Sequence, residues 1–176
     1  MPDRVRRMVK ALTGIARVAS AMVDGDEAKR MLTERAMHYV AHPDPEHRFL
    51  SGDHYDVDHD TFLRMKKTLL RLERLLDFAC HTALWVRVEG LEGWVTLAVQ
   101  NGSVHRYYRF GQERMELPPE MAACIETGQP IIAPLGHPSG TITVLAPVFD
   151  SLGEAVGVVE LSAMHPRSRS PSPAWS

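Results

Sequence analysis

The sequence of 176 residues has few cysteines and no long hydrophobic run. Its two cysteines, Cys80 and Cys124, cannot build a disulfide framework and match no zinc-ligand spacing. Both lie among apolar residues, which is typical of buried free thiols and favours a reducing compartment. No apolar stretch approaches the roughly 18 residues that cross a bilayer, and the basic N-terminus reads as a helix, not as a signal peptide. We therefore expect a cytoplasmic protein.

The sequence also lacks a large excess of charge of either sign. The 20 Lys and Arg residues nearly balance the 22 Asp and Glu residues, so no global field favours nucleic acid or an anionic membrane. There is no G-x-S-x-G, Walker or dinucleotide-binding glycine motif, and neither cysteine lies in a catalytic signature. We expect no enzyme, no cofactor, no nucleic-acid partner and no stable membrane association.

The first half of the chain has the periodicity of helices. Apolar residues at i, i+3, i+4 and i+7 predict a helix over 3–24, a second over 26–40 and a third over 60–78. Pro43 and Pro45 end the second helix, and Asp60 is the expected N-cap of the third.

The second half changes to strands joined by short turns. Strands are predicted at the β-branched runs 83–88, 94–99, 103–110, 141–146 and 155–161, and residues 131–133 are a candidate short edge strand. Asn101-Gly102 is the expected hairpin turn, and Pro147 is the expected end of the strand over 141–146. A short helix opens at Pro118 and ends at Gly128. Tight turns imply antiparallel pairing, so the fold class is α+β: an antiparallel sheet of about five strands covered by the N-terminal helices.

These elements predict one domain over 1–162, with a helical part over 1–80 and a sheet part over 81–162. The Ser/Pro/Arg-rich segment 163–176 is expected to be a disordered tail.

Several segments in order resemble one family. Residues 140–161, GTITVLAPVFDSLGEAVGVVEL, resemble the closing motif of the PAS-like single-Cache sensor domains: a strand ending in Ala-Pro-Val, a D-x-x-G turn and a Val-rich strand. Residues 110–113 and 121–128 resemble its middle elements, and residues 19–26, 50–54 and 60–62 its helical entry. GAF and PAS domains are the broader relatives. The resemblance covers about residues 15–162. It implies a PAS/Cache-like fold, a sensory ligand-binding role in signal transduction and a homodimer formed through the N-terminal helix.

Strand alternation supplies candidate residues for a small-molecule pocket. Trp85 and Arg87 share one face of their strand, and Thr141 and Thr143 share a face of theirs. A buried Arg87 that faces these hydroxyls would clamp a carboxylate; the alternative places Arg87 on the solvent face. With the mixed strip around residues 105–110, the expected ligand-binding residues are Trp85, Arg87, Tyr107, Arg109, Thr141 and Thr143.

The His- and Asp-rich segment 42–60 is the other cluster with ligand chemistry. Asp56, Asp58 and Asp60 alternate as in a calcium loop, but the glycine and glutamate of an EF-hand are missing. We expect a solvated acidic turn and no metal, with a metal site as the alternative. Asp150 is expected only to cap the turn that contains Gly153.

The sequence therefore predicts a stand-alone small-molecule sensory domain without catalysis. A ligand, for example a carboxylate, would bind between the sheet and the helices and change the packing of the first helix or of a dimer. A separate partner chain would read that change. The alternatives are a GAF-like structural dimerisation or scaffold module without a ligand, and a metal-binding protein that uses the segment 42–60.

Overall fold

A computed structural model describes residues 3–42, 56–101, 115–134 and 140–164. The elements in chain order are α1 (Asp3–Met22), α2 (Gly25–Met31), α3 (Glu34–Ala41), α4 (His59–Glu73), β1 (His81–Arg87), β2 (Trp94–Gln100), β3 (Met115–Glu116), α5 (Pro119–Thr127), β4 (Ile131–Ile132), β5 (Thr141–Phe149) and β6 (Ala155–Met164).

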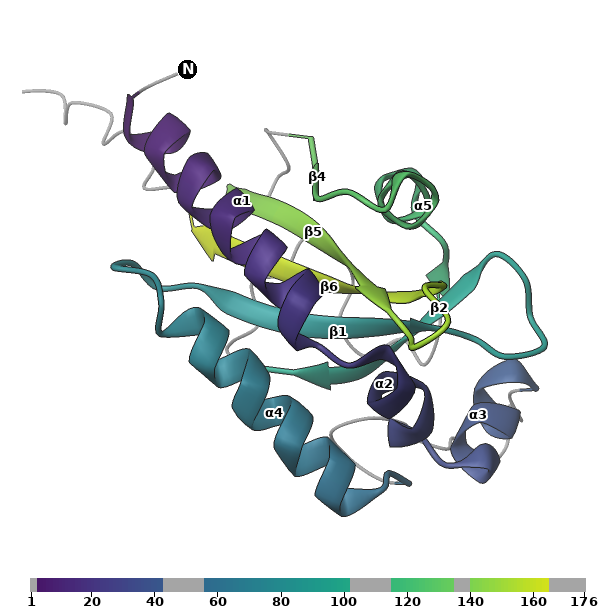
Figure 1. Cartoon of the computed structure of the whole chain (residues 1–176). Coiled ribbons are helices and arrows are strands. Elements are labelled where there is room, and N and C mark those ends of the chain that lie inside the picture. Colours follow the sequence, from purple (N-terminus) through teal and green to yellow (C-terminus); the bar gives the residue numbers. More distant parts are fainter. Residues whose placement is uncertain (1–2, 43–55, 102–114, 135–139, 165–176) are drawn as a thin grey trace, which may run out of the picture.

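The strands form one sheet with the order β3-β2-β1-β6-β5-β4. Every pairing is antiparallel, and the longest one joins β5 to β6 through the turn at residues 150–154. The last strand, β6, lies between β1 and β5, so the chain returns to the middle of its own sheet (Figure 1). The predicted α+β class with an antiparallel sheet is confirmed, with six strands in the described parts of the chain.

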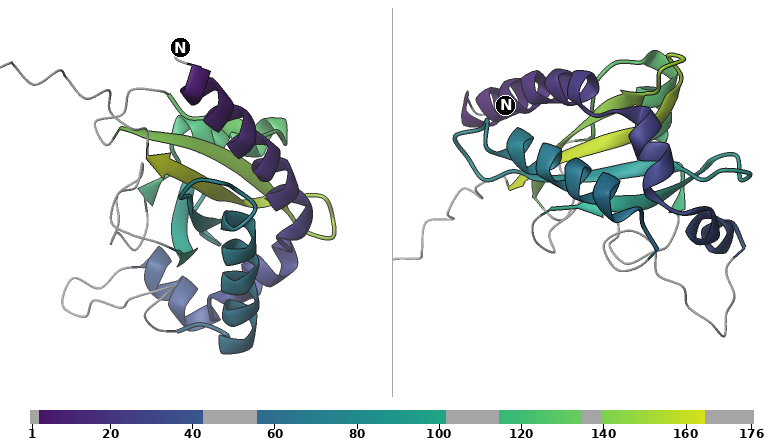
Figure 2. Two further views of the ribbon diagram at one scale, coloured as in Figure 1. Left: turned by 90° about the vertical axis from the view of Figure 1, so that its left-hand side faces the viewer. Right: turned by 60° about the horizontal axis from the view of Figure 1, so that its bottom comes forward.

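Two hydrophobic layers enclose the sheet. On the first, which we call the α1 face, Leu12 of α1, Met31 of α2 and Leu69 of α4 pack on sheet residues such as Val144 and Leu161. Figure 2 shows α1 and α4 running over this face. The second, the α5 face, carries a smaller cluster in which Met121 and Cys124 of α5 meet sheet residues. The expected cover by the N-terminal helices is therefore confirmed for one face.

The helical part differs from its prediction in the second and third of the predicted helices. The second helix is two helices, α2 and α3, because Leu32 has an extended backbone and Thr33 caps α3 by accepting a hydrogen bond from the Ala36 N–H at 3.1 Å. The α4 helix ends at Glu73, five residues before its predicted end. Its N-cap is Asp58 and not Asp60: the Asp58 carboxylate accepts from the Thr61 N–H at 2.8 Å.

In the sheet part, β5 does not end at Pro147. It continues to Phe149, and β6 extends past its predicted end to Met164. Within the described residues, β4 pairs with Val144 and Leu145 but not with Pro147, so β5 is an edge strand at Pro147. Its missing N–H therefore breaks no ladder there. The helix that was predicted to end at Gly128 is confirmed as α5, with Gly128 left-handed at φ 61°. The hairpin and strand expected over 101–110 lie almost wholly outside the described residues, as does the tail beyond residue 164.

Candidate functional site

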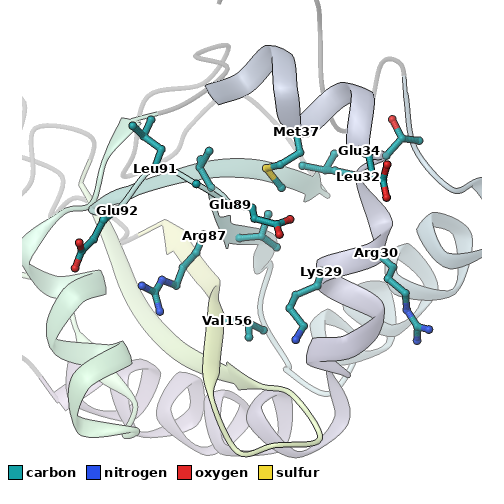
Figure 3. A pocket seen from close by; sticks show the side chains of 14 residues that line it. Lys29, Arg30, Leu32, Glu34, Met37, Arg87, Glu89, Leu91, Glu92 and Val156 are labelled. Carbon is teal, nitrogen blue, oxygen red and sulfur yellow. The ribbon is translucent and has the colours of Figure 1, made fainter. Parts of the chain in front are cut away.

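A groove lies at one end of the sheet, between α2 and α3 on one side and the β1–β2 turn on the other (Figure 3). Its volume is about 880 Å³, within the range typical of small-molecule sites. The start of β6 contributes Val156. The groove is thus built from helices and strands that are far apart in the sequence.

The floor of the groove is apolar. Val86 and Val88 come from β1 and its end, Leu32 from the α2–α3 junction, and Val156 from β6; all four are buried. Val86, Leu32 and Val156 also belong to the core of the α1 face. Because the floor is continuous with the core, it is a preformed surface.

The helical wall is held by backbone contacts that tolerate little change. Asp24 caps α2 through the Asp26 and Glu27 N–H groups. Gly25 follows, and a Cβ there would lie 2.4 Å from the Phe149 carbonyl oxygen. Only glycine lets α2 approach the end of β5 this closely.

The junction between α2 and α3 is fixed by a short bridge to the chain before α4. Leu32 pairs with Val57 as an antiparallel β-bridge. The Thr33 N–H donates to the Asp56 carbonyl at 3.1 Å, and the Asp58 N–H donates to the Met31 carbonyl at 2.9 Å. The junction between α2 and α3 is therefore held in a fixed position, where it forms part of the groove wall.

The opposite wall is the β1–β2 turn. Gly90 and Gly93 have φ of 75° and 76°, a left-handed conformation that only glycine adopts at low cost. The Val88 N–H donates to the Trp94 carbonyl at 3.0 Å and closes the turn. This geometry places Glu89, Leu91 and Glu92 along the groove.

A lysine ties the groove to the β5–β6 turn. The Lys29 ammonium lies 2.8 Å from Asp150 Oδ2, and the Asp150 side chain is fully buried. This hydrogen bond raises the pKa of Lys29 and is the main cause of the lowered pKa of Asp150. The other Asp150 oxygen accepts from the Leu152 and Glu154 N–H groups at 3.0 and 2.9 Å. Asp150 therefore caps its turn, as expected, and in addition binds Lys29.

A second polar feature is buried in the α5 face. The Trp85 indole N–H donates to Glu160 Oε2 at 2.9 Å, and the Ser162 hydroxyl donates to Glu160 Oε1 at 2.8 Å. The Ser162 and Thr143 hydroxyls are 2.9 Å apart. These four residues form a buried polar row across three neighbouring strands.

The structure separates the predicted ligand-binding residues. Trp85 and Thr143 belong to the polar row, and Thr141 is buried further along β5. Arg87 is exposed and lines the groove. The register pairs Thr143 with Ser162, and Ser162 with His81, so Arg87 lies six residues further along β1. At about 3.3 Å per residue that is about 20 Å.

The expected clamp of Arg87 with the two threonines is therefore not formed. The solvent-face alternative for Arg87 agrees with the structure, while Tyr107 and Arg109 lie outside the described residues. Sequence reasoning missed Lys29, Glu89 and Val156. Of these three residues, only Glu89 could have been suspected from the sequence, because it stands beside Gly90 in a turn between two predicted strands.

The two cysteines are free and buried, as expected. Burial is the main cause that raises the pKa of each thiol to about 12. A thiol in that state is protonated at neutral pH, so neither is a ready nucleophile.

The segment 42–60 is described only at its ends. Asp56 pairs with Arg35 at 2.6 Å, which lowers the Asp56 pKa, and Asp58 is the α4 cap. Within the described ranges, no group of three or more His, Cys, Asp or Glu side chains is placed to hold a metal ion. No helix in these ranges is long and apolar enough to cross a membrane.

The sequence matches no family model and no curated protein. Solved structures with some similarity include a GAF domain (13% identity, TM-score 0.45, 61% of this chain and 63% of that one). A second is the nlh2 GAF domain of A. aeolicus in an inactive state (14% identity, TM-score 0.40, 75% and 76%). A third is the repressor BlcR of Agobacterium tumefaciens (16% identity, TM-score 0.39, 92% and 86%).

The chain thus spans slightly less than two thirds of the first GAF domain. At these identities and TM-scores the similarities place the chain in no family. The fold class rests on the observed sheet order and register.

Proposed function

We propose that this chain is a small-molecule sensory domain in signal transduction, and that its ligand binds in the groove between α2, α3 and the β1–β2 turn. The observation that carries the proposal is the groove itself, with an apolar floor and charged side chains on its walls, as ligand sites usually have. No catalytic step is proposed, because the buried thiols are protonated at neutral pH and the chain has no nucleophile motif.

The signal would leave the groove through α2. This helix forms a wall of the groove, follows directly after α1, and is tied by Lys29 to the β5–β6 turn. A ligand that binds one position of α2 more tightly than another shifts the population toward that position. A change in α1, or in a homodimer formed through α1, would then be read by a separate partner.

Native mass spectrometry of the freshly purified protein, beside its denatured mass, tests this proposal. We expect a retained organic mass that is lost in Leu91→Trp, where the indole fills the groove, and kept in Leu152→Trp. Leu152 is a suitable control because it is 82% exposed and lies outside the groove.

A native mass with no bound organic molecule, together with a melting temperature that no compound of a metabolite panel changes, would contradict the proposal. That result would favour a structural dimerisation module. A metal mass that a chelator removes would instead favour metal binding by the segment 42–60.

A further inference from the structure

The charges that line the groove are not all available to a ligand. Lys29 is engaged by the buried carboxylate of Asp150 at 2.8 Å. Arg30 donates from Nε to the Asp26 carbonyl at 3.1 Å, and Figure 3 shows its guanidinium directed away from the groove. Lys29 is therefore paired with a carboxylate outside the groove, and Arg30 keeps its charge but is directed away from the groove.

The other charged residues that line the groove are one arginine and three glutamates. Arg87, Glu34, Glu89 and Glu92 are exposed, line the groove, and have no ion pair with any other described residue. Figure 3 shows Glu89 directed toward the wall formed by α2 and α3, and Arg87 beside Val156. After its internal pairing, the groove thus offers more negative than positive charge.

This balance disfavours a ligand that is only an anion. A carboxylate would gain one partner, Arg87, and meet three glutamates of like charge. A protonated amine would gain a carboxylate partner in Glu89, and the floor of Leu32, Val86, Val88 and Val156 would cover an apolar body.

We propose that the groove binds a small zwitterion: a molecule with one protonated amine, one carboxylate and an apolar body between or beside them. Glu89 binds the amine and Arg87 binds the carboxylate. This inference rests on the proposed function, and it replaces the simple carboxylate that the sequence suggested with a ligand of the amino-acid or short-peptide class.

Three probes that differ by one charge test the ligand class. Leucyl-phenylalanine is a zwitterion, its C-terminal amide keeps only the amine, and its N-acetyl form keeps only the carboxylate. Isothermal titration calorimetry on the full chain gives the three dissociation constants. We expect the zwitterion to bind tightest, the amide about three- to tenfold more weakly, and the acetylated form weakest.

Two variants assign the contacts. Glu89→Gln should weaken the zwitterion and the amide about three- to tenfold and leave the acetylated form unchanged. Arg87→Met should weaken the zwitterion and leave the amide unchanged. Glu120→Gln on α5, which does not line the groove, is the matched control and should change none of the three.

An acetylated form that binds as well as the zwitterion would overturn the inference and leave the proposed function standing. Equal loss in Glu89→Gln and Glu120→Gln would overturn the assignment of Glu89. If none of the probes binds while native mass spectrometry shows an organic mass that Leu91→Trp removes, the zwitterion class is wrong and the sensory site stands.

Discussion

Trp85 and Glu160 form a deeply buried polar contact in the sheet. Each is 1% exposed, and the indole N–H reaches the carboxylate at 2.9 Å. A buried carboxylate oxygen that loses a donor keeps its desolvation cost without the compensating bond. This pair therefore depends on the tryptophan for more than its apolar area.

Trp85→Phe should lower the free energy of unfolding by about 1–3 kcal/mol, because it removes the donor to Glu160 Oε2. Urea denaturation followed by far-UV circular dichroism measures the change. Trp94→Phe is the control, since Trp94 is only partly buried at the start of β2 and should cost less. Equal losses in the two variants would show that ring volume, and not the buried hydrogen bond, sets the cost.

Asp150 gives the molecule a dependence on pH that can be assigned to one carboxylate. Its lowered pKa means that its contribution to stability is present above the pKa of the unfolded carboxyl, near 3.9. That contribution is lost as the pH falls through the folded pKa. The raised pKa of Lys29 adds a second contribution to stability. It is lost only as the pH rises past about 10.5.

Asp150→Asn should therefore lower Tm at pH 6–8 and become progressively closer to the unmodified protein below pH 4. Thermal melts from pH 2.5 to pH 8 measure the difference. Asp77→Asn, at an exposed aspartate after α4, is the control and should run parallel to the unmodified protein. If the difference in Tm between Asp150→Asn and the unmodified protein were the same at every pH, the loss of stability at low pH could not be assigned to Asp150.

Residue-level reasoning from the sequence predicts how side chains alternate along one strand, but not the distances between residues on different strands. Alternation placed Trp85 with Arg87, and Thr141 with Thr143, on shared faces of their strands. It carried no information on register, and the β1–β6 and β5–β6 pairings put Arg87 and the threonines at opposite ends of the sheet. Long-range partners such as Lys29 and Asp150, 121 residues apart, leave no local pattern to find.

At the scale of elements, α2 owes its position to one glycine. Gly25 lies against the backbone of Phe149 and Asp150, so a side chain there must displace the helix or the turn. Gly14, in the middle of α1, has open space where its Cβ would be. The two glycines therefore serve as a matched pair with opposite expected effects.

Gly25→Ala should destabilise the protein by about 1–3 kcal/mol through overpacking against backbone atoms. Gly14→Ala should stabilise it by about 0.5–1 kcal/mol, since alanine is the better helix former. Chemical denaturation of both variants gives the two signs. A neutral Gly25→Ala would show that α2 is free to shift away from the β5–β6 turn.

The elements themselves were largely predictable because each has a local cause. The apolar periodicity of α1 and the left-handed Gly128 after α5 are examples. The break between α2 and α3 was missed because Leu32 continues the apolar pattern, and its extended backbone is set by a distant bridge to Val57. The groove exists because of that break, so the site is the least predictable part of the fold.

Across the whole molecule, the groove and the β5–β6 turn are two ends of one assembly centred on α2. Lys29 spans them: its ammonium holds the buried Asp150 while its stem lines the groove. Asp26 adds a second tie, because its carboxylate accepts from the Ser151 N–H at 3.1 Å. A change at the groove wall is therefore mechanically linked to the turn between the two longest strands.

Lys29→Met should loosen this assembly without unfolding the sheet, since the ammonium is lost while the apolar stem is kept. Hydrogen–deuterium exchange should become faster at residues 25–31 and 150–154 and stay unchanged in the paired parts of β1 and β6. Lys67→Met, at an exposed site on α4, controls for the loss of a charge. Faster exchange throughout the sheet would mean that Lys29 supports global stability. Unchanged exchange in both segments would mean that α2 is held without it, and that the groove has no connection through Lys29 to the rest of the molecule.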